Sequence, residues 1–362
     1  MRGTTVGLLA VVYLSISVRA QQSAPPEQAP PLAERPSTAE SAAGRRISVD
    51  VVVTDKSGAP ISGLEQKDFN LLDDKQPQKV TSFAAFDDTD AATAPPQQLI
   101  FVIDSVNTSY TTMAMERQQF DKFLHGSGPQ LPVPASFAFF TETSTEMQPH
   151  ASRDTNELSN ILSANQAGFR AVGRSAGFYG DAERVQLSIR ALGQLITHES
   201  TQPGRKLVIW ISPGWALLSS ARIELTAKQQ DMLFNTVVQL SGQLRQARMT
   251  LYSIDPLGMS DAGSGRTFYY QEFLKGVPSA KKVENGNLAL QVLAAQSGGR
   301  VLNSSNDIAK LLASCVTDAK AYYTLSFDAP RADHANEYHS LAVTVAKPGL
   351  TARTRTGYYA QP

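Results

Sequence analysis

The sequence predicts an α/β protein with a mostly parallel central sheet flanked by helices, joined to a small β-sandwich. Three observations lead to this fold class. Residues 98–320 alternate strand-like and helix-like runs, which is the pattern of a parallel sheet with helical crossovers. The strand-like runs are short and almost continuously apolar, as in strands buried on both faces. Residues 46–86 and 321–362 instead alternate apolar and polar positions, which is typical of half-exposed strands.

The first 20 residues have the pattern of a cleavable secretory signal. Arg2 precedes an apolar stretch at 6–18 that is short for a bilayer span, and Val18-Arg19-Ala20 provides small residues before a cleavage point. An uncleaved anchor is the other interpretation. No later segment is long and apolar enough for a membrane helix, so we expect a secreted or periplasmic protein without a membrane span in its mature chain.

Residues 21–45 are rich in Pro, Ala, Gln, Glu and Ser and predict a disordered spacer. The following stretch, 46–86, contains "ISVDVVVTD" and "KDFNLLDDKQPQKVTSFAAF", which is interpreted as two strands around a polar turn at 74–77. A Pro/Ala-rich linker at 87–98 comes next. So few strands form only a marginal module. We therefore expect the N-terminal strands to be completed by "AYYTLSFD", "YHSLAVTVA" and "LTARTRTGYY" of residues 321–362, with the middle inserted between them.

Within residues 98–320, the strand-like runs are "LIFVIDS", "SFAFFT", "KLVIWIS" and "MTLYSID". Helix-like runs lie between them, and Thr111, Asp154 and Asp181 are candidate helix caps. "GGRVL" followed by "SNDIAKLLASCV" predicts one more strand and helix. Cys315, the one cysteine of the chain, falls on the apolar side of that last helix, which predicts a buried thiol that forms no internal disulfide.

Oxygen-bearing side chains follow the expected strand ends. In parallel sheets, ligands bind beyond the carboxyl ends of the strands, so these residues would share one rim. An oxygen-only set suits Mg²⁺ or Ca²⁺ and disfavours zinc, whereas the simpler interpretation is a set of helix caps and turn residues. The candidate rim residues are Asp104, Asn107, Thr108, Thr141, Ser212 and Asp255.

An ordered series of stretches resembles the von Willebrand factor A (VWA) family, and in particular the VWA-related proteins of acidobacteria. The stretches are "DVVVTDKSGAPISGLEQKDFNLLDDKQPQKVTSF", "FVIDSVNT", "KLVIWISPGW", "LYSIDPLG", "LAAQSGGR", "YYTLSFDAP" and "RTGYYA". They cover nearly the whole chain after the spacer. The resemblance implies a Rossmann-like VWA domain at 98–320, and the wider family consists mostly of extracellular binding and adhesion modules.

VWA domains commonly hold Mg²⁺ through a D-x-S-x-S loop, a Thr of a later loop and the Asp of a T-D-G. On the positions of this chain, Asp104 matches the first Asp and Thr108 the second Ser, but Val106 replaces the first Ser and Pro213 replaces the Asp of T-D-G. Two oxygen donors are therefore missing. The resemblance implies a degenerate metal-ion-dependent adhesion site without a cofactor, where Asp104 and Thr108 would hold any Mg²⁺ or Ca²⁺ that did bind.

A hydrolase is the alternative enzymatic interpretation. "GRSAG" fits the G-x-S-x-G nucleophile pattern with Ser175, and Asp255 with His334 or His339 would follow in the chain order of a triad. That motif requires a buried strand before it and a helix immediately after it, and neither is evident. Short glycine-containing motifs also arise by chance.

The function expected from the sequence is an exported, non-catalytic VWA-type module for protein binding or adhesion. Lys plus Arg equals Asp plus Glu at 33 each, so the zero formal charge argues against nucleic acid as a partner. We expect the partner to be another protein outside the cytoplasm. The alternatives are a serine hydrolase using Ser175 and a purely architectural subunit of an envelope assembly.

Overall fold

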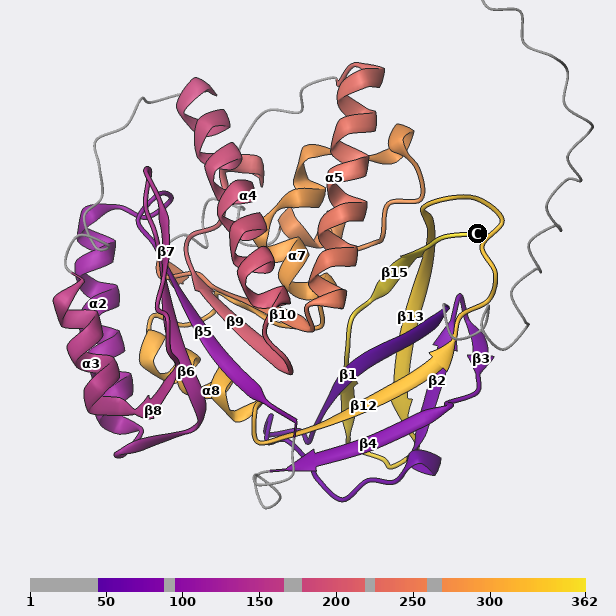
Figure 1. Cartoon of the computed structure of the whole chain (residues 1–362), viewed down its shortest axis with the longest axis horizontal. Helices are drawn as coiled ribbons and strands as arrows, with labels where there is room; N and C mark the ends of the chain where they lie inside the picture. Colours follow the sequence, from indigo (N-terminus) through magenta and orange to yellow (C-terminus); the bar gives the residue numbers. More distant parts are fainter. Residues whose placement is uncertain (1–44, 88–94, 166–177, 219–224, 259–268) are drawn as a thin grey trace, which may run out of the picture.

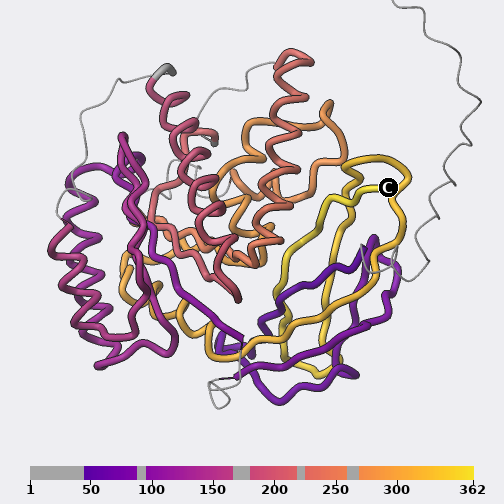
Figure 2. The backbone as a smooth tube through the Cα atoms, in the orientation of Figure 1, coloured from indigo at the N-terminus to yellow at the C-terminus, as the bar shows by residue number. Residues whose placement is uncertain are grey.

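The computed structural model describes residues 45–87, 95–165, 178–218, 225–258 and 269–362 (Figures 1 and 2). The predicted signal peptide and Ser175 lie outside these residues, as does all of the predicted spacer except its last residue. Among the helices that are described, none is long and apolar enough to cross a membrane.

A largely parallel sheet forms the centre of the α/β part. Its strands run in the order β11-β10-β9-β5-β6-β7, with β8 pairing β6. If β5, β6, β7, β9, β10 and β11 are numbered 1 to 6 in chain order, the spatial order from β7 to β11 is 3-2-1-4-5-6. This is the order of a doubly wound fold. β7 and β8 pair with β6 in the antiparallel direction, and the sequence pattern does not predict them. The strands are β5 (Gln97–Asp104), β6 (Gln130–Phe140), β7 (Thr145–Met147), β8 (Ser152–Asp154), β9 (Arg205–Ile211), β10 (Met249–Ile254) and β11 (Val301–Leu302).

Helices cover both faces of this sheet. Successive side chains of a strand point to opposite faces, so each central strand contributes to two cores. Leu99, Phe101 and Ile103 of β5 face one core, whereas Ile100 and Val102 face the other. The first core is closed by α2 (Tyr110–Gly126), α3 (Thr155–Ala164) and α8 (Ile308–Thr317). The second is closed by α4 (Phe178–Ser200), α5 (Ala227–Gln246) and α7 (Leu290–Gln296) (Figure 1). Cys315 of α8 is buried in the first core, as predicted.

The two ends of the chain meet in a pair of antiparallel four-stranded sheets, β14-β1-β12-β4 and β15-β13-β2-β3. β1 pairs with β12 from Arg46↔Asp328 onward, and β2 pairs with β13. Both sheets contribute apolar side chains to one core, as in a β-sandwich. The strands are β1 (Arg46–Thr54), β2 (Phe69–Asp73), β3 (Gln76–Gln78), β4 (Ser82–Asp87), β12 (Ala321–Asp328), β13 (Glu337–Val345), β14 (Thr351–Arg353) and β15 (Gly357–Ala360).

Several local predictions need correction. The turn after β2 is limited to Asp74 and Lys75, because both have positive φ (45° and 67°), which is the signature of a tight type I′ hairpin. Asp154 caps α3 as predicted. Helix α2 is capped by Ser109, not Thr111, since the Ser109 hydroxyl accepts from the backbone N–H of Thr112. Asp181 lies inside the first turn of α4 and does not cap it.

A buried ionic network joins the sandwich to the α/β part. Asp318, which follows α8, is 1% exposed and accepts a hydrogen bond from the Tyr252 hydroxyl of β10 at 2.9 Å. The guanidinium of Arg353 in β14 pairs with the same carboxylate, and Arg300 Nε lies 3.5 Å from it. The junction is therefore held by a shared, largely desolvated carboxylate.

Candidate functional site

The Asp104 carboxylate, at the carboxyl end of β5, is completely buried and surrounded by hydrogen-bond donors. Its Oδ1 accepts from the backbone N–H groups of Val106 and Asn107, both at 2.9 Å. Its Oδ2 accepts from Asn107 Nδ2 at 2.8 Å and from the indole Nε1 of Trp210 at 3.0 Å. Burial raises the pKa of Asp104, and the hydrogen bonds from Asn107, Trp210 and Ser212 oppose that shift. Both oxygens are thus committed to shaping the loop after β5.

The two positions that lack a metal donor have structural roles of their own. The Val106 side chain is buried in the core beneath α4 and α5. After β9, the backbone N–H of Gly214 donates to the Ser212 hydroxyl, and Gln291 of α7 donates to the Pro213 carbonyl. Gly214 has φ +95°, and a Cβ there would collide with the Gln291 side chain. The loop packs against α7 and turns no carboxylate toward Asp104.

The remaining rim residues divide into supporting and exposed positions. Four of the six predicted side chains are buried: Asp104, Thr108, Ser212 and Asp255. Asn107 and Thr141 are partly exposed. Asn107 also donates to Ser188 of α4, and the Thr141 hydroxyl bonds to Ser144 in the β6–β7 turn. The buried residues therefore support the rim from beneath.

Sequence reasoning missed Glu116 of α2, a buried acid beneath this rim. Glu116 is 0% exposed, and neither carboxyl oxygen has a hydrogen-bond partner among the described residues. Desolvation, with the nearby charges of Asp104 and Asp255, raises the pKa of Glu116 well above its usual value. Helical periodicity could have revealed it, since Glu116 falls between Met113 and Phe120 on the buried face of α2.

Glu116→Gln is expected to raise the free energy of unfolding at pH 7 by about 1 kcal/mol or more. The folded chain holds a proton that the unfolded chain releases above its carboxyl pKa. The stability from Glu116 is therefore complete at low pH and is lost as pH rises toward the raised folded-state pKa. Urea unfolding between pH 4 and 8 should show a flatter pH dependence for the variant. Glu183→Gln, at an exposed position of α4, is the control, and equal slopes in wild type and Glu116→Gln would contradict the assignment.

The donor set at Asp104 does not fit Mg²⁺, which requires near-octahedral oxygen ligation through carboxylates. We expect the melting temperature in millimolar Mg²⁺ to equal that in EDTA, because a competent site would stabilise the fold by mass action. Val106→Ser with Pro213→Asp is the matched variant that should gain metal dependence. A rise of several degrees in wild type that Asp104→Ala abolishes would disprove the degenerate site.

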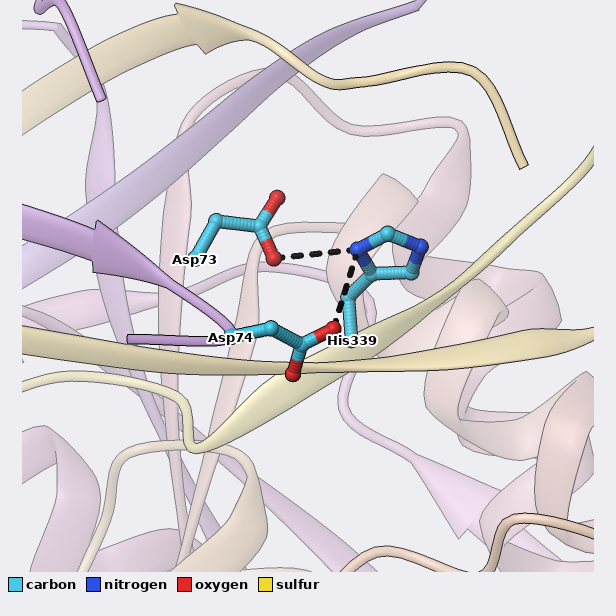
Figure 3. A group of neighbouring side chains, drawn as sticks. All are labelled: Asp73, Asp74 and His339. Carbon is cyan, nitrogen blue, oxygen red and sulfur yellow. Dashed lines mark hydrogen bonds and ion pairs between the residues drawn. The ribbon is translucent and has the colours of Figure 1, made fainter. Parts of the chain in front are cut away.

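A second polar cluster, Asp73, Asp74 and His339, lies in the sandwich (Figure 3). Nδ1 of His339 lies 3.0 Å from Asp73 Oδ1 and 3.5 Å from Asp74 Oδ2. In a tetrahedral zinc site the ligand atoms lie about 3.3 Å from one another, so the distances between these side-chain atoms are compatible with a bound cation. However, Nε2 of the buried His339 has no partner among the described residues, whereas metal-bound histidines usually donate from their second nitrogen. The hydroxyl of Tyr358 also donates to Asp73. We interpret the cluster as a structural group of hydrogen-bonded side chains that ties β2 and the turn after it to β13 and β15.

The residues proposed for a catalytic triad occupy different parts of the molecule. Asp255 follows β10 on the rim of the parallel sheet. His339 belongs to β13 of the sandwich and is engaged by Asp73 and Asp74, and His334 lies in the loop that precedes this strand. Ser175 lies outside the described residues. The described part of the chain therefore offers no imidazole at the rim beside Asp255.

Three large hydrophobic side chains are exposed on segments that follow strands of the parallel sheet. In the described residues they are the most exposed of their kind: Tyr110 at 67%, Met232 at 62% and Tyr269 at 49%. Tyr110 starts α2 after β5, Met232 lies near the start of α5 after β9, and Tyr269 follows β10. Figure 1 shows the N-terminal ends of α4 and α5 at the same end of the α/β part. Aromatic side chains and methionine are enriched at protein interfaces.

Comparisons with known proteins give no family. No protein-family model matches the chain, and no curated protein matches it. Among solved structures, a manganese-loaded TRAP protein of Plasmodium vivax aligns with 81% of this chain and 100% of its own, at 9% identity and a TM-score of 0.34. A mutant of the PilB minor pilin from Streptococcus sanguinis aligns with 63% of this chain and 62% of its own, at 10% identity and a TM-score of 0.33.

Proposed function

We propose that this chain is an exported, non-catalytic VWA-type module that binds another protein through the rim of its parallel sheet, without a bound cation. The observation that carries the proposal is the exposure of Tyr110, Met232 and Tyr269 on segments that follow β5, β9 and β10. Large apolar side chains gain free energy when a partner removes them from water. Tyrosine in particular is frequent among the residues that dominate binding energy.

The loop after β5 supports the metal-independent part of the proposal. A bound cation would have to displace the four donors that Asp104 already accepts from Val106, Asn107 and Trp210. Those donors already fix the loop that leads into Tyr110. A partner would then meet a preformed surface, which lowers the conformational cost of binding.

The test compares wild type with the triple variant Tyr110→Ser, Met232→Ser and Tyr269→Ser. A partner captured from an envelope extract is identified and purified, and its dissociation constant is measured with and without EDTA. We expect at least a tenfold weaker affinity for the rim variant, from the loss of about 1.4 kcal/mol or more, and no effect of EDTA. The control variant, Lys56→Ser with Lys79→Ser and Arg331→Ser, changes exposed positions of the sandwich. Equal binding by the rim variant would reject the rim as the contact surface.

A fluorophosphonate probe tests the absence of catalysis. Such probes label serines whose hydroxyl is activated by a neighbouring base. We expect no stoichiometric labelling of the full chain. Labelling that disappears in Ser175→Ala would favour the hydrolase over the binding module.

A further inference from the structure

Four arginine side chains line one cavity of about 210 Å³ at the junction of the sandwich and the α/β part. Arg46 comes from β1, Arg245 and Arg248 from the end of α5 and the residues after it, and Arg355 from the segment between β14 and β15. Asp50 of β1 is the one carboxylate in the lining of this cavity. Junctions between domains are common places for ligand sites.

Asp50 and Asp328 neutralise only two of these arginines. Arg248 lies 2.7 Å from the Asp50 carboxylate, which is also 4.0 Å from Arg205 Nε outside the cavity lining. Arg46 pairs with Asp328 at 3.1 Å. Arg245 and Arg355 form no side-chain hydrogen bond and no ion pair with any residue that the structure describes.

Arg355 is the more deeply buried of these two unpaired guanidinium groups. It is 7% exposed, and its burial, together with the neighbouring charge of Arg245, lowers the pKa of Arg355 to about 10. Desolvation also lowers the pKa of Arg245. A buried guanidinium without a partner is costly, because it loses the hydration that stabilises its charge. The nearby charge of Asp50 opposes the shift of Arg355 but forms no ion pair with it. The cavity thus presents one buried guanidinium, Arg355, and one partly exposed guanidinium, Arg245, without an ion-pair partner among the described residues.

We propose that this cavity binds a small oxyanion, held by the guanidinium groups of Arg245 and Arg355. The planar guanidinium places paired N–H donors at the spacing of two oxygens of a phosphate or carboxylate group. Such a ligand would neutralise both side chains and link α5 to the sandwich. The site is separate from the proposed protein-binding rim, and either can fail without affecting the other.

The test measures melting temperatures of the full chain in sodium phosphate and in sodium chloride at equal ionic strength. At a large excess of phosphate over its dissociation constant, wild type should gain about 2 °C or more. Arg355→Met replaces the aliphatic stem of the arginine with an apolar side chain of similar length and removes the charge. It should show no phosphate-specific gain, and in chloride it should melt at or above wild type because the unpaired buried charge is gone. Titration calorimetry with phosphate should show at least tenfold weaker binding to Arg245→Gln, and succinate in place of phosphate separates carboxylate from phosphate ligands.

Arg331→Gln, which removes an exposed arginine outside the cavity, is the matched control and should keep the full response. An equal gain from phosphate in all variants would indicate a general salt effect and overturn the site. The absence of any gain and of calorimetric binding in wild type would do the same. Melting of Arg355→Met well below wild type in chloride would assign the charge to the fold itself and also overturn the proposal. Arg245→Gln keeps the test decisive if Arg355→Met does not fold.

Discussion

Asp318→Asn is expected to destabilise the folded chain by about 3–5 kcal/mol. The variant keeps the shape of the side chain but leaves the charges of Arg300 and Arg353 without their buried partner. It also weakens the acceptor of the Tyr252 hydroxyl, which is fully buried in β10. Because these groups come from both parts of the molecule, the loss should appear as a lower urea midpoint for the whole chain.

The control for this prediction is Asp328→Asn. The Asp328–Arg46 pair also bridges two strands, but its side chains are 35% and 51% exposed. Solvent-exposed pairs contribute about 0–1 kcal/mol, so this variant should unfold close to wild type. Similar losses for Asp318→Asn and Asp328→Asn would show that burial of the network is not what stabilises the junction.

Asp104→Ala is expected to lower the free energy of unfolding by about 3 kcal/mol or more, by orphaning buried donors. Trp210 Nε1 and Asn107 Nδ2 would lose their acceptor, as would two backbone N–H groups of the loop. Each unsatisfied buried group costs about 1–3 kcal/mol. Denaturant unfolding in EDTA measures the effect, since no cation takes part in the expected mechanism.

Thr141→Ala is the matched control on the same rim. Its side chain is partly exposed and bonds only within the β6–β7 turn, so we expect a loss below about 1 kcal/mol. If Asp104→Ala were as mild as Thr141→Ala in EDTA but severe in Mg²⁺, Asp104 would have to be reassigned as a metal ligand.

The sheet layers were predictable because local pattern and burial agree. "LIFVID" became β5 and "KLVIWI" became β9 since both are buried on two faces. The pairing of N- and C-terminal strands was also expected, and β1 pairs with β12 accordingly. The strands β7 and β8 were missed because each has only three residues and no clear apolar alternation. Their pairing depends on the neighbouring β6, which a local pattern does not reveal.

The site was less predictable than the fold. Motif spacing selected Asp104 as a candidate, but it did not indicate that Trp210, in the neighbouring strand β9, would donate to its carboxylate. The unpaired state of Arg355 is still harder to foresee, because it depends on packing between α5 and the sandwich. Isolated exposed residues such as Tyr110 carry no periodic signal. Their proposed role in binding follows only from their exposure on segments that follow strands of the same sheet.

The pairing of β1 with β12 also has a consequence for how the chain acquires its structure. Residues 97–320 are contiguous, so the parallel sheet and its helices can assemble as soon as they are synthesised. The β1, β2 and β4 strands must wait for β12 and β13, which follow more than two hundred residues later. During that interval they have unpaired edges, which are prone to pair with other chains. Pairing across such a long stretch of chain slows folding, so we expect the sandwich to form after the parallel sheet and its helices.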